Sequence, residues 1–315
     1  MNYEFLIDAW QINEQGQGTQ VNPAELDNYD GVWMHCNRSS AEFEQWLGNE
    51  GFSEAIVKSL LATDTRPRFQ QIDEESFFLI LRGVNLNSGK QPDDMLTIRL
   101  LYTPNRLISC NLQRSRAIQS VISDFKNGQG PKSIEMLIVA ILTQVNLKIE
   151  SVLEPIEEFI DAQDVESYDV NQVNEINAMH KKLLRLNRFL KPQTHALTAL
   201  SKIEMPVFEQ HLVGLANQLD NLQRIVDTID FDIAQIDVIN SRIVQIHNEV
   251  INRNTYLLSI IAGIFLPLGF LTGLFGINIG GMPGVENSDA FYWFCGILTG
   301  IGVFEVVLFR RLKFL

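Results

Sequence analysis

The sequence predicts an α+β membrane protein with an N-terminal α/β domain, a long helical stalk and two C-terminal transmembrane helices. Three observations support this fold class. Short apolar runs separated by turn residues fill the first 130 positions, as expected for strands and short helices. From residue 131 onward the apolar residues recur with a helical period. Two long apolar runs follow, and 315 residues with 46% apolar content are enough for a core and two spans.

Residues 1–130 are expected to form a cytoplasmic α/β domain. Apolar runs predict strands over 3–12, 32–36, 77–84, 95–102 and 107–112, and short helices over 40–47 and 53–61. Pro104 and Asn105 predict a hairpin turn between the last two strands. The N-terminus has no basic segment followed by an apolar run, so no signal peptide is expected. Three widely separated cysteines fit a reducing compartment without disulfides.

Residues 131–253 are expected to form the helical stalk. Helices are predicted over 134–160 and 170–190, with an interruption at Pro192, and a third helix starts at Pro206. Along the third helix, seam positions alternate in steps of three and four, and ten of the twelve are apolar. The seam consists of Leu212, Leu215, Leu219, Leu222, Val226, Ile229, Ile233, Ile236, Asn240, Ile243, His247 and Val250.

The seam continues into the first C-terminal apolar run, which predicts one helix of about 70 residues, roughly 105 Å long. Its two polar positions, Asn240 and His247, favour a role in fixing register or oligomer state, and a metal or proton role for His247 stays open. An acidic stripe is predicted on the solvent side of this helix. The stripe consists of Asp220, Asp227, Asp230, Asp232 and Asp237.

Residues 254–309 are expected to form a transmembrane hairpin. Residues 256–276 contain no charge, and at a helical rise of about 1.5 Å per residue they reach roughly 31 Å, enough to cross a bilayer core. Residues 290–309 form a second run whose only charge is Glu305. Snorkelling or pairing of Glu305 with Arg310 is favoured over a proton-carrying role, since the two lie about one turn apart.

The distribution of basic residues predicts the orientation of the hairpin. Arg253 precedes the first span, and a basic tail over residues 310–315 follows the second, whereas the loop carries Glu286 and Asp289 and no Lys or Arg. By the positive-inside rule, both termini are cytoplasmic and the loop faces outward, where its two carboxylates are candidates for attracting cations.

Residues 276–278, Gly276, Ile277 and Asn278, follow the first span and resemble the Gly-Met-Asn signature of the CorA family of divalent-metal transporters. Residues 272–284 are closer to the ZntB zinc-transporter branch of that family, and residues 65–68 resemble the same branch. Ile277 departs from the commoner Met or Val. The resemblance implies a homopentameric funnel in a bacterial inner membrane that transports divalent cations without a bound cofactor.

The resemblance implies that Asn278 meets the metal at the outer mouth. A ring of amide oxygens suits an ion that keeps its water shell, because hydrogen bonds to that water need no ligand exchange. The alternative is an Asn that caps the helix before a glycine turn. In a ring of hairpins, the first span carries the small and polar residues and is the pore candidate, although its glycines also fit close helix packing. The predicted pore-lining residues are Asn252, Thr255, Ser259, Ala262, Leu266 and Gly273.

Composition excludes several other classes of function. All but three of the 38 acidic and all but three of the 25 basic residues precede Asn254, so this part carries the entire net charge of −13, which disfavours nucleic-acid partners. No nucleotide-binding glycine motif or catalytic triad spacing is present, so no enzyme is predicted. A membrane-anchored scaffold stays as a remote alternative.

The identity of the metal follows from weighing ligand chemistry against the resemblance. Zinc prefers imidazole, thiolate or carboxylate ligands, and the predicted mouth and pore contain none of these. Local chemistry therefore predicts a hydrated ion and broad selectivity that includes cobalt and nickel. The likeness to the ZntB branch favours zinc as the cargo, magnesium is the alternative, and coupling to protons stays open.

Overall fold

The computed structural model describes residues 4–22, 24, 29–63, 65–163, 170–276, 284 and 286–311. Contacts divide the chain into two units, Met1–Ile239 and Asn240–Leu315. Each unit is treated separately below. The division into four parts at residues 130, 253 and 309 stays a prediction.

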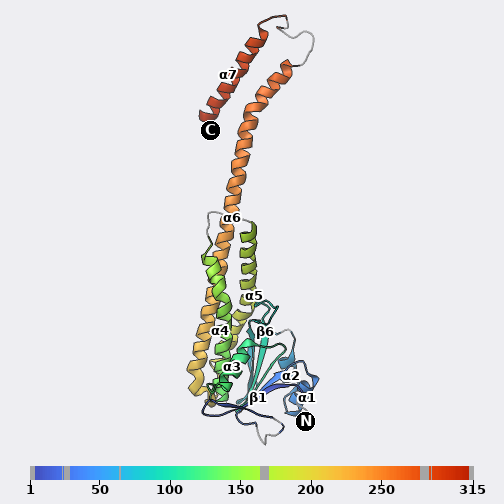
Figure 1. The fold of residues 1–315 in the computed structure, drawn as a ribbon, viewed down its shortest axis with the longest axis vertical. Helices are drawn as coiled ribbons and strands as arrows, with labels where there is room; N and C mark the ends of the chain where they lie inside the picture. Colours follow the sequence, from blue (N-terminus) through green and yellow to red (C-terminus); the bar gives the residue numbers. More distant parts are fainter. Residues whose placement is uncertain are drawn as a thin grey trace. The chain divides into compact units, whose positions relative to one another are not determined.

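A seven-stranded sheet forms the centre of the first unit, with the strand order β2-β1-β3-β7-β6-β5-β4 (Figure 1). Neighbouring strands pair in antiparallel fashion except β3 and β7, which are parallel. The strands are β1 (Leu6–Ile12), β2 (Gly18–Gln20), β3 (Val32–Asn37), β4 (Arg68–Gln71), β5 (Phe77–Gly83), β6 (Leu96–Thr103) and β7 (Arg106–Asn111). Asn105 adopts a positive φ of 53° in the β6–β7 turn, as Asn tolerates at such a position.

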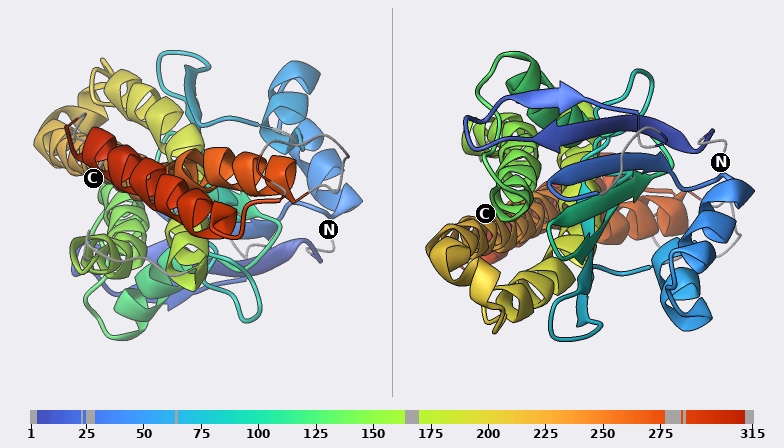
Figure 2. Two further views of the ribbon diagram at one scale, coloured as in Figure 1. Left: turned by 90° about the horizontal axis from the view of Figure 1, so that it is seen from above. Right: turned by 90° about the horizontal axis from the view of Figure 1, so that it is seen from below.

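Helices cover both faces of this sheet, which explains why its central strands are almost continuously apolar. On one face, Phe78, Ile80 and Leu101 join a core with residues of α1 (Ala41–Asn49) and α2 (Glu54–Leu61). On the other face, Trp33 contacts Phe125 of α3 (Arg116–Lys126), with ring centroids 6.0 Å apart. Figure 2 shows the two groups of helices on either side of the strands.

Three long helices continue from this second face. They are α4 (Ile134–Asp161), α5 (Val170–Leu200) and α6 (Leu212–Phe275), and the short 3-10 helix η2 (Pro206–His211) precedes α6. The Tyr102 hydroxyl donates to Glu135 Oε1 at 2.8 Å and ties β6 to the first turn of α4. Within the first unit, Asn146 Nδ2 donates to the Gln218 carbonyl at 3.0 Å and ties α4 to α6. The predicted α/β domain with a helical stalk is confirmed.

Several sequence predictions need correction. The helix α5 does not stop near Pro192 but continues through it to Leu200. Two short strands, β2 and β4, and the helix α3 were not predicted. Asp232 was placed on the solvent side of α6, yet its side chain is buried. The third stalk helix begins as the 3-10 segment η2 and becomes α-helical at Leu212.

The buried stripe of α6 also differs from the predicted seam. Leu215, Leu222, Val226, Ile229 and Ile236 of the seam are buried, whereas His247 and Val250 are exposed. The buried positions of α6 that lie off the seam are Gln218, Ile225, Asp232 and Ile239. The burial shifts because α6 packs against both α4 and α5 within its own unit, so these two helices determine which of its residues are buried.

The second unit contains the end of α6 and the helix α7 (Ala290–Arg311), which lies beside it (Figure 1). A Cβ on Gly263 would lie 2.8 Å from Phe309 Cζ, so the two helices approach closely at that point. The rings of Phe275 and Phe294 lie 5.0 Å apart. By length and composition, three helical stretches within the described ranges could cross a membrane: α4, Pro206–Phe275 and α7. Within the apolar stretch of 18 residues that could span the membrane, 44% of the α4 residues are buried. In the corresponding stretches of the other two, 0% are buried.

Candidate ion mouth and pore face

The end of α6 carries the described part of the predicted mouth. The Gly276 N–H points to both the Thr272 carbonyl, at 2.9 Å, and the Gly273 carbonyl, at 3.2 Å. A Cβ at Gly276 would lie 2.9 Å from the Thr272 oxygen, so a side chain here would disturb the last turn. Gly276 therefore suits this tightened helix end. Ile277 and Asn278 lie outside the described residues.

The predicted pore-lining residues occupy one exposed stripe of α6. Asn252, Thr255, Ser259, Ala262, Leu266 and Gly273 are all exposed in the second unit. At 100° per residue, these positions fall within about 80° of one another around the helix axis. The stripe thus forms a single narrow face.

The packing of α7 leaves that stripe open. From Asn252 onward, the partly covered residues of α6 lie on a different side of the helix, centred roughly 130° around the helix axis from the stripe. They are Ile260, Gly263, Ile264, Pro267, Leu268 and Leu271. Two of them, Gly263 and Leu268, lie next to Phe309 and Gly302 of α7. The hairpin therefore turns its small and polar stripe away from its own second helix, as a helix lining a shared axis would.

Hydroxyl groups on this part of α6 are satisfied within the helix. Ser259 Oγ donates to the Thr255 carbonyl at 2.9 Å, and Thr272 Oγ1 donates to the carbonyls of Leu268 and Gly269 at 3.0 Å. Their oxygen lone pairs are left to accept hydrogen bonds, which is what the water shell of a cation offers. Pro267 lies inside the helix and removes one N–H donor, so the Gly263 carbonyl loses its usual partner.

Carboxylates near the mouth are exposed. Glu286 and Asp289 form no ion pair among the described residues, and both face solvent. The loop is ordered locally by the Asn287 side chain, which accepts the Asp289 N–H at 3.0 Å. On α7, Glu305 Oε2 is buried without a hydrogen-bond partner among the described residues, and no ion pair of those residues joins it to Arg310, so of the two favoured arrangements the pairing is not formed.

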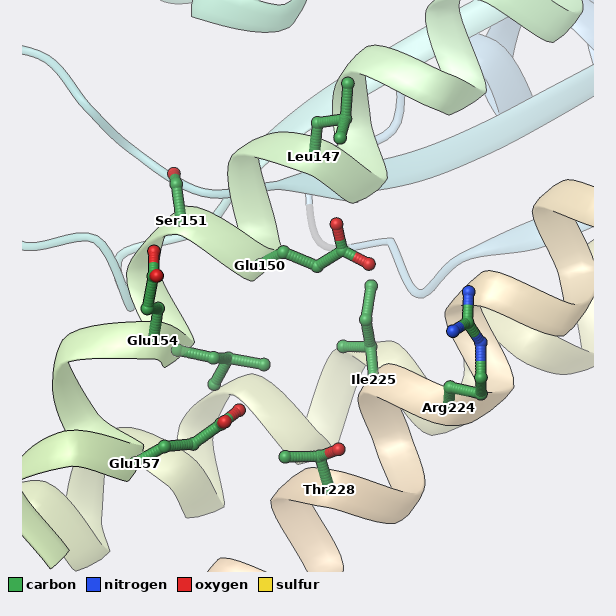
Figure 3. A pocket seen from close by; sticks show the side chains of 9 residues that line it. Leu147, Glu150, Ser151, Glu154, Glu157, Arg224, Ile225 and Thr228 are labelled. Carbon is green, nitrogen blue, oxygen red and sulfur yellow. The ribbon is translucent and has the colours of Figure 1, made fainter. Parts of the chain in front are cut away.

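A second acidic site lies in the first unit, where α4 faces α6. A cavity of about 470 Å³ is lined by Glu150, Glu154 and Glu157 on one side and by Arg224 and Thr228 on the other (Figure 3). Arg224 is also paired with Asp220 at 3.7 Å. Within the described ranges, no group of three or more His, Cys, Asp or Glu side chains could hold a metal ion. This cavity is therefore not a preformed metal site, and sequence reasoning did not single it out.

Comparison with known proteins identifies the family. A family model described as CorA-like Mg2+ transporter protein matches residues 28–311. The chain belongs to this family. The expected membership of the CorA family, and the expectation of a transporter rather than an enzyme, are confirmed.

Individual relatives cover nearly the whole chain. The zinc transport protein ZntB of Vibrio parahaemolyticus is 39% identical over 312 residues, covering 98% of this chain and 97% of that protein. The divalent cation transporter CmaX of Pseudomonas aeruginosa is 31% identical over 324 residues, 98% of this chain and 97% of that protein. The structure of full-length CmaX matches with a TM-score of 0.84 at 29% identity, covering 99% of both chains.

A solved domain of a relative also matches part of this chain. The crystal structure of the ZntB cytoplasmic domain from Vibrio parahaemolyticus matches with a TM-score of 0.73 and 32% identity. It covers 78% of this chain and 99% of that domain.

Proposed function

We propose that this protein carries divalent metal cations across a bacterial inner membrane, with zinc as its main cargo. The observation that carries the proposal is the exposed stripe of small and polar residues on α6, which faces away from α7 and ends at Gly276. Such a stripe lines a polar path only when several copies of α6 surround one axis. A hairpin that served merely as an anchor would gain nothing from it.

The assembly that fits this geometry is a homopentamer, with α6 as the inner helix and α7 toward the lipid. Asn278 then contributes an amide oxygen to a ring at the outer mouth, and Glu286 and Asp289 raise the local cation concentration beside it. The termini lie in the cytoplasm. Support for the pentamer and for this orientation comes from the signature residues and from the basic residues that flank the spans.

Zinc is proposed over magnesium because of the relatives. The ZntB protein that is 39% identical is named a zinc transport protein, while the family model itself is named for magnesium. The predicted pore face offers hydroxyl and amide oxygens but no imidazole or thiolate, so zinc would pass as a hydrated ion. A magnesium transporter is therefore the alternative function.

Metal competition in proteoliposomes tests the proposal. Purified protein should take up zinc, and excess cobalt or nickel should reduce that uptake because hydrated divalent ions of similar size compete for the same oxygens. Magnesium flux without zinc flux would overturn the choice of cargo. Zinc uptake that excess cobalt and nickel leave unchanged would contradict passage of a hydrated ion.

A pH gradient across the same vesicles tests whether proton movement is coupled to metal transport. If protons move with the metal, an inward gradient raises zinc uptake, and Glu305→Gln should keep that stimulation because snorkelling or pairing is the favoured role of Glu305. Loss of the stimulation in Glu305→Gln would contradict that role.

A further inference from the structure

A cavity of the first unit lies between α4, α5 and the segment that joins β5 to β6. Its volume is about 280 Å³, close to the lower end of the range for small-molecule pockets, about 300–1,000 Å³. Most of the residues that line it are apolar. These apolar residues are Pro92, Val152, Pro155, Ile156, Met179 and Leu186. We call this space the Asp93 cavity, after the buried acid in its wall.

The Asp93 side chain brings a negative charge to this apolar wall. Asp93 is 5% exposed, and among the described residues one hydrogen bond reaches its carboxylate, from Arg185 Nη1 to Oδ2 at 2.9 Å. The other oxygen, Oδ1, has no partner within the same residues. Because a carboxylate offers about four acceptor positions, Asp93 can accept further donors. A donor from the cavity would compensate the hydration that burial removes from the charge.

A backbone acceptor stands in the same wall. Pro155 lies inside α4 and has no N–H, so the carbonyl of Ser151, four residues earlier, loses its usual helical donor. Ser151 and Pro155 both line the cavity, which places this carbonyl at its edge. The Asp93 cavity therefore offers two acceptors. An ammonium group, with three N–H donors, can bond to both.

A positive charge comes from Lys182 of α5, which also lines the cavity. It lies three residues before Arg185, on the same face of the helix. Its ammonium group forms no ion pair with the residues that the structure describes. Arg185 itself has a side chain that is 57% exposed, so its charge stays hydrated. The cavity thus presents one carboxylate and one ammonium group to a ligand.

We propose that the Asp93 cavity binds a small α-amino acid with an apolar side chain, with leucine as the representative ligand. The ligand ammonium group donates to the Asp93 carboxylate and the Ser151 carbonyl, and the ligand carboxylate accepts from Lys182. The ligand side chain lies against the apolar wall. Charge-assisted hydrogen bonds at both ends fix the orientation of the ligand, because they are stronger than neutral ones.

The two charges explain why a zwitterion fits better than a simple amine or acid. An amine would leave Lys182 without a counter-charge, and an acid would leave the acceptors of Asp93 and Ser151 without donors. Unpaired polar groups in a closed site cost affinity, so each of these ligands should bind more weakly. A bound amino acid would also join α4, α5 and the β5–β6 segment.

Equilibrium dialysis of the full-length protein in detergent with radiolabelled leucine tests the proposal. We expect one leucine per chain, with a dissociation constant in the millimolar range or lower. Isocaproate has the same carbon skeleton without the ammonium group, and isoamylamine lacks the carboxylate. Each should displace labelled leucine at least about tenfold less effectively than unlabelled leucine does, because each leaves one charged group of the cavity unpaired.

Substitutions locate the bound leucine. Lys182→Gln removes the partner of the ligand carboxylate and should weaken leucine binding at least about tenfold. The matched control is Lys181→Gln, which changes an exposed lysine of the same helix that is not among the lining residues, and it should bind leucine normally. Asp93→Asn removes the charge that pairs with the ligand ammonium group and should weaken binding similarly.

Three results would overturn the amino-acid site. They are no leucine bound at millimolar concentrations, equal binding by Lys182→Gln and Lys181→Gln, and displacement by isocaproate or isoamylamine as effective as that by leucine. If Asp93→Asn fails to fold, the two lysine variants still decide, because neither lysine is buried. None of these results bears on metal transport, so the proposed function is tested separately.

Discussion

At the scale of single residues, Asp232 is the acid whose environment departs furthest from sequence expectation. It stands on the buried stripe of α6 between Ile229 and Ile236, with 3% of its surface exposed, and its Oδ2 has no hydrogen-bond partner among the residues that the structure describes. Burial is the larger cause, and the carboxylates of Glu157 and Asp161 on α4 add to it, so the pKa of Asp232 rises to about 6. A carboxylate here opposes the packing of α4 on α6.

The charge of Asp232 makes stability depend on pH. Because its pKa is higher in the folded state than the 3.8 of the free group, the folded protein binds the proton more tightly and loses stability as pH rises from about 4 through 6. A difference of about two pKa units corresponds to roughly 3 kcal/mol. Asp232→Asn should therefore melt at a higher temperature than the unaltered protein at pH 8, and this difference should shrink as the pH falls and vanish only at about pH 4 or below. Parallel melting curves across this range would contradict the burial of the charge.

Residue-level prediction succeeded where a pattern is local and failed where it depends on partners. The small and polar stripe of α6 could be predicted, since helical period alone sets which residues share a face. Asp232 was misplaced because its neighbour α4 is far away in the sequence. The shared hydrogen bonding of Arg38 and Arg99 to the Ala62 carbonyl was missed for the same reason, because these two residues meet only through the order and register of the strands.

At the scale of elements, the contact of α6 with α7 depends on the absence of a side chain at Gly263. Its hypothetical Cβ lies 2.8 Å from Phe309 Cζ, whereas nothing lies within 4 Å of a Cβ at Gly269. Both substitutions to Ala gain helix propensity, about 1 kcal/mol each. Gly263→Ala should nevertheless be the less stable variant, because overpacking costs about 1–3 kcal/mol.

A double substitution isolates that contact. Phe309→Leu shortens the opposing side chain and should restore the melting temperature of Gly263→Ala in detergent. If Gly263→Ala and Gly269→Ala melt alike, or if Phe309→Leu brings no recovery, the two helices do not approach at Gly263.

Element prediction was reliable for long or strongly apolar segments and weaker for short polar ones. The run at β5 is apolar over most of its length and was predicted almost to the residue. The strand β4 has the sequence Arg-Phe-Gln-Gln, which lacks the alternation of apolar and polar residues that predicts a strand. It forms a strand because its backbone pairs with β5, a contact that the local sequence does not indicate. Pro192 was expected to end a helix, but tertiary packing of α5 on β4 and β5 carries the helix through it.

At the scale of the whole molecule, the second unit exposes large apolar side chains that need a cover. Phe265, Leu266 and Phe270 of α6 are each at least 67% exposed. Lipid can cover one side of the hairpin, and further copies of the chain can cover the other. We therefore expect native mass measurement of the detergent-solubilised protein to give a pentamer. A monomer or dimer as the sole species would contradict this assembly.

Flux through the proposed mouth is the most direct test of the account. Asn278→Ala and the matched loop variant Asn287→Ala are reconstituted in proteoliposomes, and zinc uptake is measured for assemblies of confirmed mass. Loss of the Asn278 amide removes the oxygen ring from the pore axis, so uptake should fall at least tenfold, equivalent to about 1.4 kcal/mol. Asn287→Ala loses only a local turn bond and should transport normally. Near-normal zinc uptake by correctly assembled Asn278→Ala would contradict the account.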